Sequence, residues 1–216
     1  MDIKDQFDRT VVEKYEIYDY NKAGLILKYY YQEQYDDVIE SLKKYRILIK
    51  DILEPGGSES QIPKKFKKLI VSRGWTDEVV LHSKSIVEQR KNKKILNKVT
   101  IEHDTHRVDY VKGKVAIDFE WNSKDQTYDR DLYAFRAFHD SQMISVAIII
   151  TRGYDIEKWI GEYGNFIPKD GKPRPLKSKF GASTTNMTQL TRRLEANRQG
   201  GCPTLVFGIT SKIIDE

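Results

Sequence analysis

The spacing of apolar residues in the first third of the chain predicts helices. Between residues 33 and 53 apolar side chains recur at steps of three and four, the period of a helix with one buried face; they are Tyr35, Val38, Ile39, Leu42, Tyr45, Ile49 and Ile52. The turn-rich segment before it, "YDYNKAGLILK", offers Asn21 as a helix cap. The breaker "EPGGSES" (54–60) ends the helix, and a short helix over about 62–73 is expected to stop at Gly74.

Strand patterns dominate the centre of the chain. Residues 76–105 are mixed and favour a strand at 79–82 and a helix around 84–98. "THRVDYV" and "KVAIDFEW" predict two strands joined by a glycine-containing hairpin turn. "DQTYDRDLYAFRAFHDSQ" predicts an amphipathic helix, whose expected apolar face is Tyr128, Leu132, Phe135 and Phe138 or His139.

The apolar run "MISVAIIIT" (143–151) is typical of a strand buried on both faces. Strand, helix and buried strand in that order form a crossover expected to be right-handed. A polar loop with prolines at 168, 173 and 175 precedes a helix at about 187–198 and a last strand, "PTLVFGI" (203–209). The predicted fold class is therefore α/β, a central mixed sheet flanked by helices. We expect a single domain over residues 1–216, mainly helical over 1–75 and an α/β core over 76–216.

Two carboxylates interrupt the apolar strand at 115–121. Because side chains alternate along a strand, Asp118 and Glu120 face away from its apolar residues, and the hairpin can bring Asp109 beside Asp118. Three carboxylates on one face repel each other unless a cation holds them. Oxygen ligands favour Mg²⁺ or Mn²⁺ over zinc, and such a metal could polarise a scissile phosphate. The alternative is a polar outer strand face with solvated acids.

The composition indicates a globular protein of the cytoplasm. Apolar residues make up 39% and charged residues 32%, and no apolar run approaches the roughly 20 residues that span a bilayer. The first residues lack the basic and apolar regions of a signal peptide. Cys202 is the only cysteine, so no internal disulfide can form, and its position before an apolar strand predicts a residue of the core or sheet end.

Positive charge is concentrated after residue 60. Residues 1–60 hold 9 Lys/Arg against 13 Asp/Glu, a net of −4, while the remainder holds 28 against 19, a net of +9. The basic clusters are "KKFKK" (64–68), "RKNKK" (90–94), "KDGKPRPLKSK" (169–179) and Arg192-Arg193. Such a surface suits a phosphate backbone, although a solvated lysine-rich surface has the same composition.

Other common chemistries find no support. The four histidines have no zinc-site spacing, and Cys202 has no partner ligand. Neither a GxxxxGK[ST] loop nor a strand–GxGxxG–helix is present, which removes the common nucleotide-binding folds.

The carboxylate pattern resembles that of type II restriction endonucleases of the BglII and BstYI group, with BamHI more distant. Asp109 followed by Asp118-Phe-Glu120 is similar to that group's variant of the PD-(D/E)xK nuclease motif. The resemblance extends in order along most of the chain, through "DYNKAGLIL", "YDDVIESL", "KKFKKLIVSRGW", "VAIIITRG" and "GGCPTLVFGI".

This resemblance implies a restriction-endonuclease-like fold and a homodimer that cuts both strands of a short palindrome in double-stranded DNA. It further implies Mg²⁺ as cofactor with Mn²⁺ as a substitute, a site centred on GATC, and a place in a restriction–modification system. Asp109 and Asp118 fall on metal ligands. Glu120 falls where most of these nucleases have lysine, so its role stays open between positioning and general base. Asp118 is shorter than the glutamate usual there.

Two segments match base-reading loops of the group. The first implicates Asn122, Ser123 and Lys124, and the second implicates Lys179, Ser183 and Thr184. Residues 183–185 could instead only cap the following helix. The group's further upstream acid or amide is not clearly matched; Glu88 and Asn92 are the candidates. A repair nuclease and a non-catalytic DNA-binding protein remain as alternatives.

Overall fold

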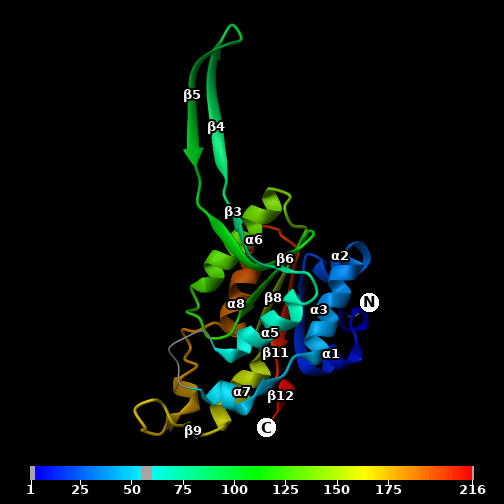
Figure 1. The fold of residues 1–216 in the computed structure, drawn as a ribbon, viewed down its shortest axis with the longest axis vertical. Coiled ribbons are helices and arrows are strands. Elements are labelled where there is room, and N and C mark those ends of the chain that lie inside the picture. Colours follow the sequence, from blue (N-terminus) through cyan, green and yellow to red (C-terminus); the bar gives the residue numbers. More distant parts are fainter. Residues whose placement is uncertain (1–2, 55–59, 216) are drawn as a thin grey trace.

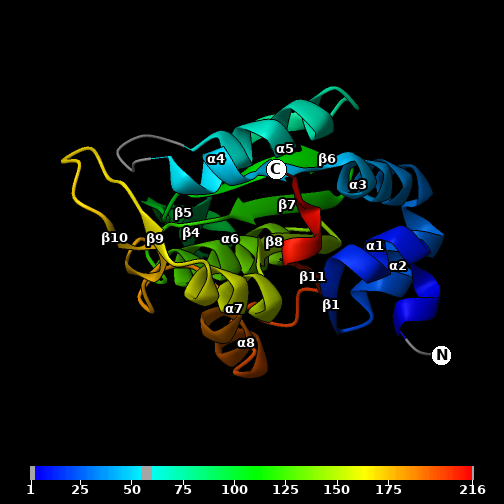
Figure 2. The ribbon, with the colours of Figure 1, turned by 90° about the horizontal axis from the view of Figure 1, so that it is seen from below.

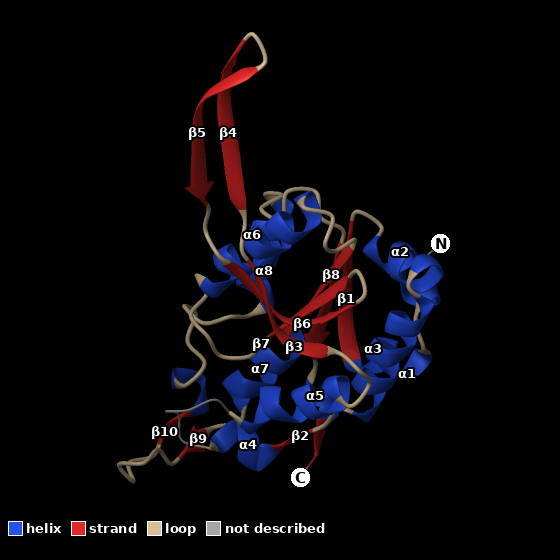
Figure 3. Ribbon diagram, turned by 45° about the horizontal axis from the view of Figure 1, so that its top comes forward, coloured by secondary structure: helices blue, strands red, loops and turns tan. Residues whose placement is uncertain are grey.

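The computed structural model describes residues 3–54 and 60–215, which are built around a six-stranded mixed sheet (Figures 1 and 3). Its strand order is β1-β11-β8-β7-β6-β3, where the strands are β1 (Tyr15–Tyr20), β11 (Thr204–Ile209), β8 (Val146–Arg152), β7 (Val115–Glu120), β6 (His106–Lys112) and β3 (Thr76–Leu81). The central strands β11, β8 and β7 run parallel, and every other pairing is antiparallel. The predicted α/β class with a central mixed sheet is confirmed.

Helices cover both faces of this sheet (Figure 2). One apolar cluster joins a sheet face to α3 (Gln32–Lys44), α5 (Gln61–Val71) and α7 (Tyr154–Glu162). The other cluster joins the opposite face to α6 (Thr127–Asp140) and α8 (Met187–Glu195). The N-terminal elements near β1 are η1 (Ile3–Gln6), α1 (Arg9–Lys14) and α2 (Ala23–Tyr30). No helix in the described part of the chain is long and apolar enough to cross a membrane.

Strand β7 alternates as predicted. Val115, Ile117 and Phe119 pack into the α3/α5 cluster, whereas Ala116 packs into the α6/α8 cluster. The β6–β7 turn contains Gly113 at φ +57, a left-handed conformation that glycine adopts at little cost. Helix α6 buries Phe138 and leaves His139 half-exposed. The carboxylate hairpin therefore lies beside the central parallel strands.

The single helix predicted over 33–53 is wrong. Helix α3 ends at Lys44, β2 (Ile47–Leu48) pairs with β12 (Ile214–Asp215), and α4 (Ile49–Leu53) follows. Apolar periodicity continues through the break because Tyr45 is also buried, and its hydroxyl donates to the Ile62 carbonyl at 2.9 Å. The pairing with the far end of the chain is invisible to a local pattern.

The helix predicted around 84–98 is also wrong. These residues form a long hairpin of β4 (Lys84–Lys91) and β5 (Lys94–Glu102). Asn92 and Lys93 form its turn at φ 48 and 67, the double positive φ of a tight hairpin turn. Both faces of the hairpin are largely exposed, so no core-facing alternation marks the strands.

The ends of several other elements differ from expectation. Strand β1 was not predicted, and Asn21 is no helix cap, because Lys22 precedes α2 and the Asn21 amide donates to the Gly201 carbonyl at 3.1 Å. Helix α8 ends at Glu195, and its cap is Asn186 rather than a residue of 183–185. The polar loop before it contains the short pair β9 (Asn165–Phe166) and β10 (Arg174–Pro175) and the turn η2 (Leu176–Ser178). A last turn, η3 (Ser211–Ile213), precedes β12.

Cys202 lies in the core, as predicted, and we expect its thiol to be inert in the folded protein. Its side chain is fully buried in the α6/α8 cluster, and this burial raises the pKa of the thiol to about 12. The thiolate, which is the reactive form, is therefore nearly absent at pH 8. Titration with a thiol reagent should find no fast-reacting group in native protein and one after denaturation; fast reaction of the native protein would contradict this burial.

Candidate active site

Strands β6 and β7 separate at the predicted acids. Their ladder ends at the pair Tyr110↔Ile117. Beyond it, the Asp109 amide donates to Asp118 Oδ1 at 2.7 Å, and the Phe119 amide donates to Asp109 Oδ2 at 2.9 Å. Two carboxylates thus take the place of backbone carbonyl acceptors at this point. This exchange anchors both aspartates where the strands part.

A cleft of about 620 Å³ opens at this fork. All three predicted carboxylates line it: Asp109, Asp118 and Glu120. Three of the predicted DNA-contacting residues also line it, namely Asn122, Ser123 and Lys179, whereas Lys124, Ser183 and Thr184 are not part of its lining. Its basic residues include Lys67, Arg107, Arg130 and Lys179. Residues from Asp51 to Phe180 therefore share one cavity although they lie far apart in the sequence.

A fourth carboxylate, Asp131 of α6, was missed by sequence reasoning. It is buried, lines the cleft and accepts hydrogen bonds from the Arg130 guanidinium at 2.9 and 3.1 Å. Its position carried a signal, because it lies three residues after Tyr128 and directly before Leu132, on the apolar face of the helix. A charged residue at such a position is rarely buried without a specific reason.

Burial and mutual repulsion raise the pKa of three of these acids. For Asp118, loss of solvent is the main cause and the charges of Asp131 and Asp109 add to it, so its pKa lies well above the ordinary value. Loss of solvent, followed by repulsion from Asp131, raises the pKa of Glu120 to about 8. Loss of solvent also raises the pKa of Asp131 to about 6, and the positive charge of Arg130 partly offsets this rise. Without a cation, this cluster is costly to ionise.

The carboxylate oxygens of the cleft suit a hard divalent cation that takes its remaining ligands from the substrate. Asp118 Oδ2, Glu120 Oε2 and Asp131 Oδ2 are buried oxygens without a hydrogen-bond partner. Within the described residues, no three Asp, Glu, His or Cys side chains form a group that could hold a metal by themselves. Mg²⁺ usually takes one or two carboxylates together with waters and phosphate oxygens, so a complete protein cage is not required.

The two predicted base-reading segments lie side by side. The Thr185 amide donates to the Ser123 carbonyl at 2.9 Å, and the Asp125 amide donates to the Ser183 carbonyl at 2.9 Å. Lys124 and Thr184 form a bridge between these two contacts. We call residues 122–125 and 183–185 the paired loops. Pairing gives the two segments one fixed relative geometry.

Not all six of the predicted DNA-contacting side chains are free. The Lys179 ammonium donates to the carbonyls of Ile52, at 2.6 Å, and Glu54, and burial lowers its pKa. The Thr184 hydroxyl donates to the Gly181 carbonyl at 2.7 Å and accepts from Arg152. Asn122 donates to the Lys179 carbonyl at a longer 3.3 Å and is exposed.

A fully buried arginine holds the paired loops against β8. The Arg152 guanidinium donates to the Thr185 carbonyl at 2.6 and 3.0 Å and to Thr184 Oγ1 at 2.7 Å. It also lies 4.9 Å from the Phe180 ring centre and forms an ion pair with Glu157 at 3.1 Å. Arg152 directly follows Thr151, and Thr151 pairs with Glu120 of β7. Arg152 therefore links the paired loops to β8, the strand next to the carboxylates.

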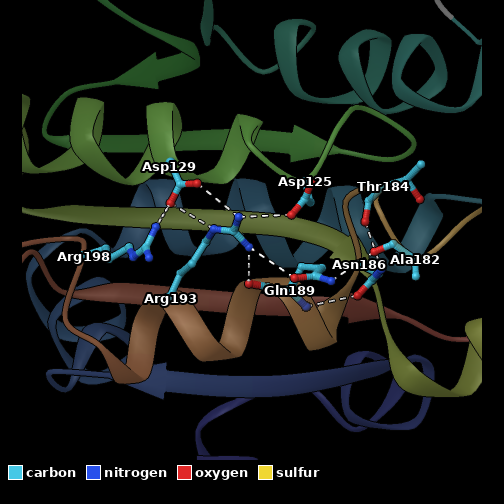
Figure 4. Close-up of polar contacts among 8 residues, drawn as sticks. All are labelled: Asp125, Asp129, Ala182, Thr184, Asn186, Gln189, Arg193 and Arg198. Carbon is cyan, nitrogen blue, oxygen red and sulfur yellow. Dashed lines mark hydrogen bonds and ion pairs between the residues drawn. The ribbon is translucent and has the colours of Figure 1, made fainter.

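A second arginine supports the paired loops from α8 (Figure 4). Arg193 donates to Asp129 at 3.0 and 3.1 Å and to Asp125 at 3.2 Å. Gln189, one turn earlier, donates to the Ala182 carbonyl at 3.0 Å. Helices α6 and α8 are thereby joined at the base of the loops.

The suggested upstream residues Glu88 and Asn92 do not reach the cleft. Glu88 is ion-paired with Arg90 and Lys98 on the β4–β5 hairpin, and Asn92 occupies its turn. Upstream acids that do line the cleft are Asp51, Glu54, Asp77 and Glu78. Of these, Asp77 is paired with Lys67 at 2.7 Å, and Asp51 with Lys65.

A family model described as restriction endonuclease BglII/BglIII matches residues 15–209. The chain belongs to this family. As a BglII-family member it is a type II restriction endonuclease, an enzyme that hydrolyses DNA. The match begins at the first residue of β1 and ends at the last residue of β11, so it includes all six strands and the cleft acids. A search of curated protein sequences gives no significant match to this chain.

Proposed function

We propose that this enzyme hydrolyses phosphodiester bonds in both strands of a short palindromic DNA site with Mg²⁺ as its cofactor. The observation that carries the proposal is the cluster of buried carboxylates, three of which have an unpartnered oxygen, in the wall of the cleft. Fragments of mixed-sequence DNA should be discrete with Mg²⁺ or Mn²⁺ and absent with EDTA. A smear in place of discrete fragments would favour a nuclease without sequence preference.

In the proposed mechanism Asp109 and Asp118 hold the metal ion, and the neighbouring Asp131 adds to the negative charge that attracts it. When bound, Mg²⁺ supplies Lewis acidity toward the scissile phosphate and offsets the repulsion among the carboxylates. Arg130, which is ion-paired with Asp131 at 2.9 Å, gives the cleft a cation facing the substrate. Lysines of the basic clusters bind backbone phosphates, which orients the duplex without reading its sequence.

Sequence reading is assigned to the paired loops and to two copies of the chain. The proposed reading residues are Asn122, Ser123 and Lys124 on one loop and Ser183 and Thr184 on the other. Support comes from the backbone pairing of the two loops and from the position of Asn122 and Ser123 in the lining of the cleft. A homodimer would present two such surfaces to a two-fold site, for which we propose a GATC centre. The proposed setting is a restriction–modification system in the cytoplasm. Lys179 contributes by fixing the loop after η2, because its ammonium is already bound to two carbonyls.

Glu120→Gln should separate a general base from a positioning group. We propose that Glu120 accepts the proton of the attacking water, because its Oε2 is buried at the cleft without a partner. Glutamine keeps the shape and can orient water but cannot take the proton, so the cleavage rate should fall about 10²–10⁴-fold. Single-turnover cleavage measures it, and a rate within a few-fold of wild type would instead assign Glu120 a positioning role.

A further inference from the structure

The β4–β5 hairpin projects away from the rest of the molecule (Figures 1 and 3). Its strands pair with each other from Lys84↔Glu102 to Lys91↔Lys94. They make no extensive contact with another element of the described chain. At about 3.3 Å per residue an eight-residue strand reaches about 26 Å, the length of about eight base pairs of duplex DNA.

This hairpin carries most of the net charge of the protein. Residues 84–102 contain six Lys/Arg and two Glu, a net of 6 − 2 = +4, whereas the whole chain has +5. Five of these basic residues lie between residues 90 and 98, around the turn. Lys91, Lys93 and Lys94 are exposed, and none of them forms an ion pair within residues 3–54 and 60–215. Glu88 forms ion pairs with Arg90 and Lys98, so the uncompensated positive charge is that of the three lysines next to the turn.

The two strands that lead into the hairpin contribute to the wall of the cleft. Its strands continue β3 and β6, which are still paired at Val80↔Arg107 and Leu81↔His106. Arg107 and Asp109 of β6 line the cleft, and the hairpin extends from the end of β6 that precedes them. A duplex lying on the carboxylates would extend past the base of the hairpin.

Cross-strand pairs stiffen the projecting part. Val87 lies opposite Val99, and Ile86 lies opposite Thr100, so β-branched side chains meet across the ribbon. Exposed apolar residues also occur at Ile95, Leu96 and Ile101. A second copy of the chain could cover an apolar face, but the net charge of +4 and the position beside the cleft favour a polyanion.

We propose that the β4–β5 hairpin is a second DNA-binding element, which holds backbone phosphates of the duplex flanking the cut site. The proposal builds on the DNA-hydrolase activity and extends the proposed placement of the duplex over the carboxylates. A two-stranded ribbon fits the major groove of DNA, and the lysines at its turn reach phosphates without reading bases.

The test measures binding, without cleavage, of fluorescent mixed-sequence duplexes in Ca²⁺. In the triple variant Lys91→Gln, Lys93→Gln, Lys94→Gln, the slope of log affinity against log salt should fall by up to about 3, at about 0.9 per lost phosphate contact. At moderate salt the affinity for a duplex of about 40 base pairs should fall about tenfold or more, and the difference should shrink on a duplex of about 12. The charge-preserving variant Lys91→Arg, Lys93→Arg, Lys94→Arg should keep the wild-type slope.

A matched control removes three exposed lysines outside the cleft, Lys22→Gln, Lys44→Gln and Lys212→Gln. The same loss in this control, or an unchanged slope in the hairpin variant, would overturn the proposal. Reduced oligomer mass with unchanged DNA binding would also overturn it and assign the hairpin to a second copy. DNA cleavage by the wild type is scored separately, so failure of the catalytic proposal remains distinguishable.

Discussion

Asp118→Asn is expected to abolish DNA cleavage and, at the same time, to stabilise the metal-free protein. Asparagine keeps an oxygen that can accept the hydrogen bond from the Asp109 amide, which is 2.7 Å long in the wild type. It loses the negative charge that would hold a metal. Loss of metal-assisted chemistry worth several kcal/mol predicts a fall of at least about 10³-fold in single-turnover rate.

The stability change follows from the raised pKa of Asp118. Burial and the charges of Asp131 and Asp109 lift this pKa well above 3.8, so the stability present below 3.8 is lost as pH rises toward the raised value. At pH 8 in EDTA the neutral asparagine avoids that loss, and the melting temperature should rise by about 2–6 °C. Adding Mg²⁺ should raise the melting temperature of wild type and leave the variant unchanged. Lower metal-free stability of the variant would contradict this view of the cluster.

Arg152→Met is expected to lower both stability and cleavage. Methionine fills part of the space but leaves the Thr185 carbonyl without its donor and the Glu157 carboxylate without its ion-pair partner. Removing one partner of a buried ion pair typically costs about 3–5 kcal/mol, and partial exposure of Glu157 favours the lower end, about 3 kcal/mol. Release of the paired loops should reduce cleavage by about 100-fold, the effect of a displacement of about 1 Å at an active site.

Two further variants separate the charge effect from the loop effect. Adding Glu157→Gln to Arg152→Met should recover stability but not cleavage, because the loops remain unheld. Arg152→Lys keeps the charge and loses the two-point contact with Thr185, so its cleavage should be intermediate. Denaturant unfolding and single-turnover rates measure the two effects. Recovery of cleavage in the double variant would show that the loops do not depend on Arg152.

The sequence predicted the β6–β7 hairpin and its clustered carboxylates because strand alternation and a glycine turn are local properties. Asp109, Asp118 and Glu120 could be placed together from spacing alone, and residues 15–209 then matched the family as a whole. Asp131 was missed although it interrupts an apolar helix face. A single acid in such a pattern is commonly interpreted as a residue at the solvent-exposed margin of the helix. The supporting arginines could not be predicted, because Arg152 and Arg193 meet partners 32 to 68 positions away.

The two wrong helix predictions have different physical causes. The break after Lys44 is set by pairing of β2 with β12 at the other end of the chain, and periodicity could not detect it. The β4–β5 hairpin has two exposed faces, so no buried apolar face distinguishes its strands from a helix in the sequence. Only its turn, with Asn92 at positive φ, offered a local signal.

The central claim is that the clustered carboxylates cut both strands of one palindromic site. Run-off sequencing of mixed-sequence DNA after incubation with the enzyme and Mg²⁺ tests it most directly. We predict ends at a single short palindrome, placed symmetrically on the two strands, with Asp118→Asn leaving the DNA intact. Scattered ends, ends on one strand only, or the same ends from Asp118→Asn would contradict the account.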